Sequence, residues 1–162
     1  MPYALLALVL VILDQVVKYL VLTYIPLGGY VPFLPHIVCL TYVQNTGAAF
    51  SMFSQHTWIL ALISLIMSVV LAVALWKNFF THPLGKVTLA LLLAGAVGNL
   101  IDRTLRGFVV DMFQLLFMNF AVFNVADICV VVGGIAAAAY YLLLADKLEH
   151  KEAPHGTADA DR

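Results

Sequence analysis

The sequence predicts an all-α membrane protein with four transmembrane helices, a small extracytoplasmic β-sheet platform and a short interfacial helix. Of the 162 residues, 64% are hydrophobic and only 10% are charged, and the mean hydropathy is +1.01, well above that of soluble domains. Four apolar stretches also reach the roughly 20 residues that a helix needs to cross a bilayer. They cover residues 3–24, 58–76, 87–105 and 127–144, so we expect one integral membrane domain over residues 1–148.

The first predicted helix, residues 3–24, could be mistaken for a secretory signal peptide. It lacks a basic start and an A-x-A cleavage site, so we interpret it as a retained helix. Asp14 and Lys18 lie four positions apart in it, in the acid-then-base order that favours pairing on one helix face. The simplest interpretation is a structural ion pair that locks the helix bundle.

The segment 25–57 is too long to be a turn. It contains "PLGGYVPFLP" followed by "HIVCLTYVQN", a turn signal followed by β-branched residues with alternation, which is typical of a short strand. Residues 48–53 then form a short amphipathic piece. We expect a small sheet that rests on the membrane surface beside a short interfacial helix.

The third predicted helix, residues 87–105, ends in small and then polar residues. Gly95 and Gly98 are spaced to let another backbone come close, as small residues do between membrane helices. Asn99, Asp102 and Arg103 follow within the next turn and share one face. The sequence therefore places a polar cluster at one end of the bundle.

The basic residues predict the orientation. Lysines and arginine occur in the connector between helices two and three and in the C-terminal tail, whereas residues 25–57 contain none. The positive-inside rule then places both termini in the cytoplasm and the segments 25–57 and 106–126 outside. The tail 149–162 is polar, contains Pro and Gly, and is expected to be disordered.

Several classes of function have no support in the composition. A net charge of −1 gives no basic patch for nucleic acid. Cys39 and Cys129 lack disulfide or metal spacing and are expected to be buried, and the five histidines show no metal-ligand spacing. No serine lies in a G-x-S-x-G pattern. We therefore expect neither metal nor cofactor.

Two aspartates remain as candidates for hydrolytic chemistry, Asp111 in the second outer segment and Asp127 at the start of the fourth helix. Two buried carboxyls that lie close together share one proton, so one can act as acid and the other as base, as in aspartic proteases. Alternatively, Asp127 is a helix N-cap and Asp111 is a loop residue paired with Arg103 or Arg106.

A rival interpretation is a non-enzymatic transporter or assembly factor that uses an intramembrane carboxylate relay. A relay should distribute ionisable groups across the whole membrane thickness. In this sequence the inner halves of helices two, three and four contain none beyond the terminal lysines. The distribution favours chemistry at one face.

Five sequence blocks together resemble the lipoprotein signal peptidase family, the type II signal peptidases of bacteria. The blocks are "DQVVK" at 14–18, "QNTGAAFS" at 44–51, "AGAVGNLIDR" at 94–103, "VVDM" at 109–112 and "FNVAD" at 123–127. The resemblance implies four helices with an outer β-cradle in the bacterial cytoplasmic (inner) membrane. It also implies cleavage of prolipoprotein signal peptides just before a cysteine that carries a diacylglyceryl group.

By the same resemblance, Asp111 and Asp127 are the catalytic dyad of an aspartic endopeptidase, which we expect to be a monomer in contact with membrane lipid. The remaining site residues are implied to bind substrate or support the dyad: Asn45, Gly47, Asn99, Arg103, Asn124, Ala126, Asp14 and Lys18. The chain departs from the family pattern at Gln44, where a basic residue is frequent, at Met112, where Phe is common, and at Ala121, where Pro is common. No departure removes a carboxyl of the dyad.

Overall fold

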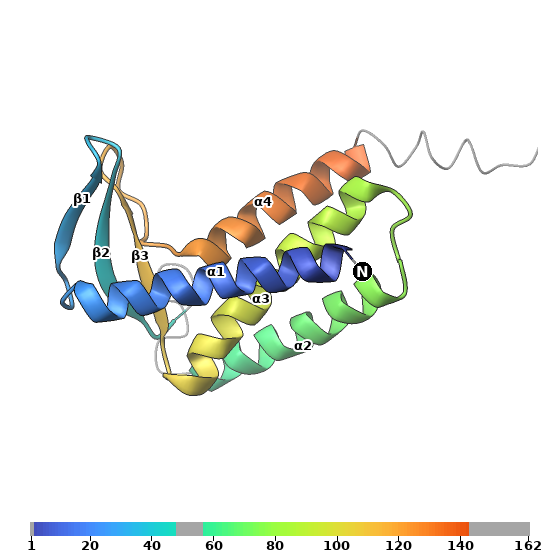
Figure 1. Ribbon diagram of the computed structural model, residues 1–162, viewed down its shortest axis with the longest axis horizontal. Helices are drawn as coiled ribbons and strands as arrows, with labels where there is room; N and C mark the ends of the chain where they lie inside the picture. The colour runs from blue at the N-terminus through green and yellow to red at the C-terminus, as the bar shows by residue number, and fades with distance from the viewer. Residues whose placement is uncertain (1, 48–56, 143–162) are drawn as a thin grey trace, which may run out of the picture.

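The computed structural model describes residues 2–47 and 57–142. In chain order its elements are α1 (Pro2–Tyr24), β1 (Tyr30–Leu34), β2 (Val38–Asn45), α2 (Thr57–Trp76), α3 (Pro83–Leu105), β3 (Val109–Leu115) and α4 (Val125–Tyr140). The helices form a bundle, and the three strands form a small sheet at one end of it (Figure 1). The predicted interfacial helix at 48–53 and the predicted tail at 149–162 lie outside the described residues.

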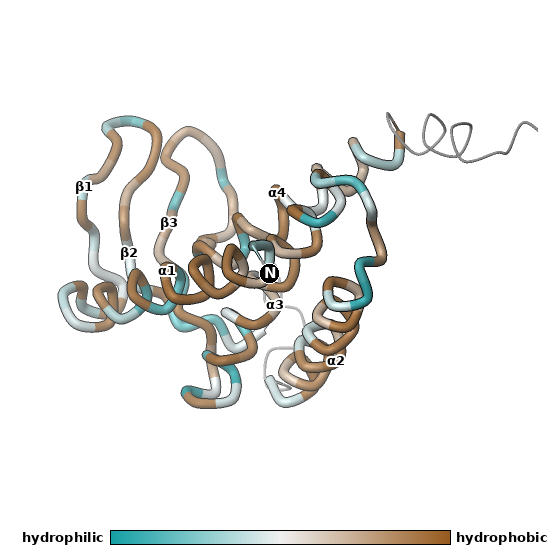
Figure 2. Tube along the Cα trace, turned by 45° about the vertical axis from the view of Figure 1, so that its right-hand side comes forward, coloured by the Kyte–Doolittle hydropathy of each residue, from teal (hydrophilic) through white to brown (hydrophobic). Residues whose placement is uncertain are grey.

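The helices α1, α2 and α3 are long and apolar enough to cross a membrane. The described part of α4 has 16 residues, and its crossing of the bilayer stays a prediction. Apolar residues predominate along α1 and α2 (Figure 2), and many of their large side chains are exposed, among them Leu8, Ile12, Leu62 and Ile66. Such apolar surfaces suit contact with lipid.

Two helices begin earlier than predicted because of their caps. α3 starts at Pro83, after His82, whose Nδ1 accepts a hydrogen bond from the Leu84 amide at 3.2 Å. α4 starts at Val125, with Asn124 as its N-cap. The alternative that Asp127 is the N-cap is therefore wrong: Asp127 is the third helical residue and completes a capping box with Asn124.

The sheet is antiparallel with strand order β1-β2-β3. β2 confirms the short strand expected over residues 36–45. β1 lies within the stretch interpreted as a turn, and neither β1 nor β3 was predicted. The interpretation of Asp111 as a loop residue is wrong, because it lies in β3 opposite Val43 of β2. A buried apolar cluster joins the sheet to the end of α1; it contains Val21, Ile25, Tyr42, Val110 and Met112.

Small residues let α4 and α1 approach α3, as the sequence predicted. A Cβ atom added at Gly95 would lie 2.5 Å from the carbonyl oxygen of Ala126, and one at Gly98 would lie 2.6 Å from Oδ2 of Asp14. Neither distance is compatible with a side chain. This close packing carries the first residues of α4 up to the polar face of α1.

Candidate active site

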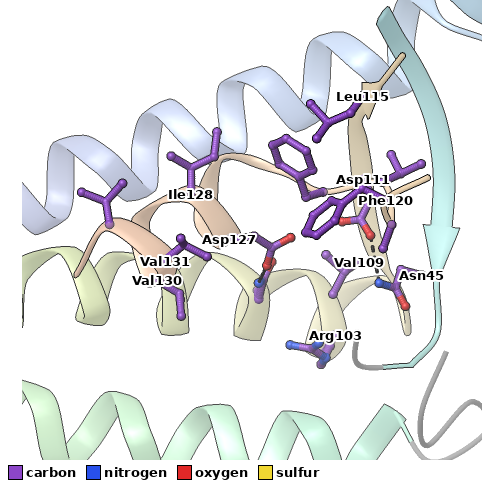
Figure 3. Close-up of a pocket in the computed structure, with 15 residues that line it drawn as sticks. Asn45, Arg103, Val109, Asp111, Leu115, Phe120, Asp127, Ile128, Val130 and Val131 are labelled. Carbon is purple, nitrogen blue, oxygen red and sulfur yellow. Dashed lines mark hydrogen bonds between the residues drawn. The ribbon is translucent and has the colours of Figure 1, made fainter. Parts of the chain in front are cut away.

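Both candidate aspartates line one cavity of about 460 Å³ between α3, β3, α4 and the segment that leads into α4. Three further polar residues line it, Asn45, Asn99 and Arg103. Figure 3 shows Asp127 and Asp111 projecting from α4 and β3 toward this space. The remaining walls are apolar, with Leu115, Phe120, Ile128 and Val131 among them.

Asp111 is held on β3 by two amide side chains. Its Oδ2 accepts a hydrogen bond from Nδ2 of Asn45 at 2.9 Å, and its Oδ1 accepts one from Nδ2 of Asn124 at 2.7 Å. The residue is only 2% exposed. Burial raises the pKa of the Asp111 carboxyl, and repulsion from the Asp127 carboxylate raises it further, to about 6. This carboxyl therefore exchanges its proton close to neutral pH.

Asp127 sits in the first turn of α4. Its Oδ1 accepts a hydrogen bond from Nδ2 of Asn99 at 2.8 Å, and its Oδ2 accepts one from the Asn124 amide at 3.2 Å. A helix N-terminus favours negative charge, and both donors stabilise the ionised carboxylate. Both carboxyls thus accept two hydrogen bonds, and Asp127 differs from Asp111 in lying at a helix N-terminus.

Asn124 connects the two carboxyls. Besides Asp111, its Nδ2 donates to Oδ1 of Asn99 at 3.2 Å, and its Oδ1 accepts from the Asp127 amide at 2.9 Å. The side chain is fully buried. One residue thus caps α4, orients Asp127 and bonds Asp111, so a change at Asn124 alters both carboxyls.

A buried ion cluster lies behind the cavity and is centred on Lys18. Its Nζ donates to Asp14 Oδ2 at 2.9 Å, to Asp102 Oδ2 at 3.1 Å and to Asn99 Oδ1 at 3.1 Å. Arg106 pairs with the other carboxylate oxygen of Asp102. The predicted pair of Asp14 and Lys18 is confirmed, and it belongs to a larger cluster that reaches Asp127 through Asn99.

The other predicted residues also adjoin this network. The Ala126 amide donates to Asp14 Oδ1 at 2.9 Å, and the Gly47 amide donates to Asn45 Oδ1 at 2.9 Å. Nη1 of Arg103 donates to Oγ of Ser64 at 3.3 Å. The alternative in which Asp111 pairs with Arg103 or Arg106 is wrong, because Asp111 bonds the two asparagines and Arg106 bonds Asp102.

Sequence reasoning missed two contributors to the site. Gln15, next to Asp14, donates to the carboxylate of Asp14 at 3.1 Å and to the carbonyl oxygen of Gly98 at 3.2 Å. The second is the apolar wall of α4. Val131 lies four residues after Asp127, so helical spacing alone places both on one face, and this signal could have found it.

Among the residues that the structure describes, there is no group of three or more His, Cys, Asp or Glu arranged to hold a metal ion. The polar groups that face the cavity are two carboxyls, two amides and one guanidinium. Such a set can position a water molecule, bind a carbonyl oxygen and move protons.

Comparison with known proteins identifies the family of this chain. Residues 6–143 match the family model described as signal peptidase (SPase) II. The chain is 44% identical to the lipoprotein signal peptidase of Enterococcus faecalis over 155 residues, which cover 96% of this chain and 95% of that one. It is 46% identical to the lipoprotein signal peptidase of Streptococcus pneumoniae over 136 residues, covering 80% and 85%.

A solved structure described as a bacterial membrane enzyme has the same fold. It superposes with a TM-score of 0.82 at 31% sequence identity and covers 99% of this chain and 94% of its own. The likeness spans the helices and the sheet together.

Proposed function

Because this chain belongs to the signal peptidase II family, we propose that it removes signal peptides from prolipoproteins by aspartic catalysis, with Asp111 and Asp127 as the dyad. The protein is a multi-pass membrane protease, as its family and its apolar helices establish. One observation carries the assignment of the dyad: both carboxyls line the same cavity, and burial together with repulsion from Asp127 raises the pKa of Asp111 to about 6.

In this mechanism Asp127 is the base and Asp111 is the acid. Asp127 takes a proton from a water molecule, whose oxygen forms a bond to the scissile carbonyl carbon, while Asp111 donates its proton to the carbonyl oxygen. The carbon–nitrogen bond then breaks as the proton held by Asp127 passes to the leaving amine. Asp111 takes back a proton from a hydroxyl group of the intermediate, which becomes the new carboxyl group, and the dyad returns to its starting state. The helix N-terminus at Asp127 and the raised pKa of Asp111 support these roles.

The remaining residues position this pair. Asn45 and Asn124 hold Asp111, and Asn99 holds Asp127, each through the hydrogen bonds given above. Arg103 offers a fixed positive charge to the substrate backbone. Gly47 and Ala126 are small and leave room for substrate and for close packing. Lys18 holds Asn99, and Asp14 holds the start of α4 through the Ala126 amide.

The substrate in this proposal is a prolipoprotein that carries a diacylglyceryl group, cleaved just before the modified cysteine. Each methylene group that leaves an apolar environment costs about 0.8 kcal/mol, so a lipid-bearing substrate should arrive sideways from the bilayer. The apolar wall formed by Phe120, Ile128 and Val131 suits such an approach. We propose that the protein acts on this substrate as a monomer.

The placement in the membrane completes the proposal. α4 is the fourth span, both termini are cytoplasmic, and the active site lies near the outer face of the bacterial cytoplasmic membrane. The distribution of lysines and arginines in the sequence supports this orientation.

The test is incubation of the purified protein with a diacylglyceryl-modified prolipoprotein and with its unlipidated twin. The wild type is expected to shorten only the lipidated form. Asp111→Asn and Asp127→Asn should each abolish cleavage while the protein stays folded in detergent. Near-normal turnover by either variant would rule out the dyad, and equal cleavage of both substrates would rule out recognition of the lipid.

A further inference from the structure

The helix α2 reaches the site through one serine. It contains two serines, Ser64, which is partly buried, and Ser68, which is buried; they are four residues apart and so lie on one face. Ser68 Oγ donates to the Ser64 carbonyl oxygen at 2.7 Å, a bond within the helix itself. Ser64 Oγ instead accepts a hydrogen bond from Nη1 of Arg103 at 3.3 Å. Among the described residues this is the one side-chain hydrogen bond between α2 and α3.

The Arg103 guanidinium is close to several carboxylates without pairing with them. The carboxylates of Asp127, Asp111 and Asp102 all attract it, and Arg103 lies on the side of the cavity that faces α2 (Figure 3). Yet the ion pairs within 4.0 Å among the described residues join Lys18 to Asp14, Lys18 to Asp102, and Arg106 to Asp102. Arg103 therefore lies near Asp111 and Asp127, but its hydrogen bond goes to Ser64 and not to either carboxylate.

A direct bond from Arg103 to the dyad would harm catalysis. Guanidinium and carboxylate groups form strong, frequently bidentate pairs. Such a pair would hold a dyad carboxylate in its ionised form, occupy the oxygens that must exchange protons, and remove the guanidinium from the substrate. A further contact is therefore needed that keeps the Arg103 guanidinium off the dyad carboxylates and still leaves its positive charge near the cavity.

We propose that Ser64 is a positioning residue that holds the Arg103 guanidinium at the cavity wall, out of direct contact with Asp111 and Asp127. This inference rests on the proposed function, since it concerns the same dyad. An uncharged hydroxyl oxygen suits the task because it accepts from the guanidinium without neutralising it. α2 presents no charged group to Arg103 among the described residues, so Ser64 is its polar contact on that side.

A second contact links α2 to the site. Thr57, the first residue of α2, donates from Oγ1 to the carbonyl oxygen of Thr46 at 3.0 Å. Thr46 follows Asn45, which bonds Asp111. The start of α2 is thus tied to the strand end that carries Asn45, a hydrogen-bond partner of Asp111.

The test compares three conservative variants on the diacylglyceryl-modified prolipoprotein. Ser64→Ala is expected to lower kcat about tenfold, equivalent to about 1.4 kcal/mol, with KM within about twofold of wild type, because the guanidinium moves onto the dyad. Ser64→Thr keeps a hydroxyl and should retain most of the activity. Ser68→Ala is the matched control: it removes the same atom one turn further along α2, where the bond is internal, and kcat should not change.

The outcomes separate this inference from the proposed function. If the wild type fails to cleave the lipidated substrate, the proposed function itself is wrong. If the wild type cleaves and Ser64→Ala keeps kcat within twofold, or Ser68→Ala loses as much, Ser64 is not a positioning residue. Thermal unfolding in detergent accompanies each assay, and a fall in kcat at an unchanged melting temperature supports the positioning role.

Discussion

Replacing Asp111 by asparagine is expected to stabilise the protein at neutral pH while abolishing its activity. A carboxyl whose pKa rises from 3.8 to about 6 on folding lowers the free energy of unfolding by about 3 kcal/mol at pH 7. The asparagine side chain cannot ionise, so the variant avoids this cost. It loses one of the two hydrogen bonds that the carboxylate accepts, about 1 kcal/mol. The net gain at pH 7 is about 2 kcal/mol.

The sign of the pH dependence follows from the direction of the shift. Between pH 4 and pH 6 the folded state binds the Asp111 proton more tightly than the unfolded state does. The contribution of this carboxyl to the free energy of unfolding therefore falls as the pH rises through that window, and the cost is complete above pH 6. The variant shows no such fall, so the two proteins should diverge as the pH rises.

The assay is thermal unfolding of the wild type and Asp111→Asn in one detergent, at intervals from pH 4 to pH 7.5. On the scale of domains of this size, about 2 kcal/mol corresponds to roughly 4–8 °C, so the variant should melt that much higher at pH 7 and at or slightly below the wild type at pH 4. The control is to introduce Asp111→Asn into a protein that already carries Asp127→Asn. That protein lacks the repulsion that helps to raise the pKa of Asp111, so the gain in melting temperature at pH 7 should be smaller. A melting difference that does not vary with pH, or a variant less stable at pH 7, would refute the assigned electrostatics.

Three further changes test the packing, the ion cluster and the chemistry. Gly98→Ala should lower the free energy of unfolding by about 1–3 kcal/mol, because its Cβ would lie 2.6 Å from Asp14 Oδ2; Gly134→Ala, where no atom lies within 4 Å, should cost nothing in the same unfolding assay. Lys18→Met leaves the buried carboxylates of Asp14 and Asp102 without their shared ammonium, and a loss of about 3–5 kcal/mol is expected; an unchanged melting temperature would contradict that role. Activity on the lipidated prolipoprotein should survive exhaustive treatment with EDTA, and its loss, restored by added metal, would point to a metalloenzyme.

Much of the helical architecture is predictable because the bilayer itself sets the length of an apolar helix. The first two helices differ from prediction by one residue at their starts, and α3 ends at Leu105 as predicted. Gly95 and Gly98 also predicted that other helices pack closely on α3, because small residues are typical of positions where membrane helices touch. The helix bounds and the two glycines were predictable because the residues that the local pattern calls for are also the ones that the packing of the helices requires.

The elements that sequence reasoning missed depend on partners distant in the chain. The sequence of β3, VVDMFQL, has no period-two alternation of apolar and polar residues. It becomes a strand by pairing with β2, whose Asn45 pairs with Val109. The α4 cap was readable in principle, because Asn124 and Asp127 have capping-box spacing. The bonds from Lys18 to Asn99 and from Ser64 to Arg103 join separate helices, and no local pattern encodes them.

The charges near the cavity explain why one proton on the dyad is favourable. Behind the cavity, the carboxylates of Asp14 and Asp102 are balanced by Lys18 and Arg106, so the ion cluster contributes no net charge to the dyad. In front of it stands Arg103, with a single positive charge that does not titrate. If both dyad carboxyls were ionised, the cavity would hold an uncompensated negative charge in surroundings of low dielectric. One ionised and one protonated carboxyl balance Arg103, and this is the state from which the proposed attack of water begins.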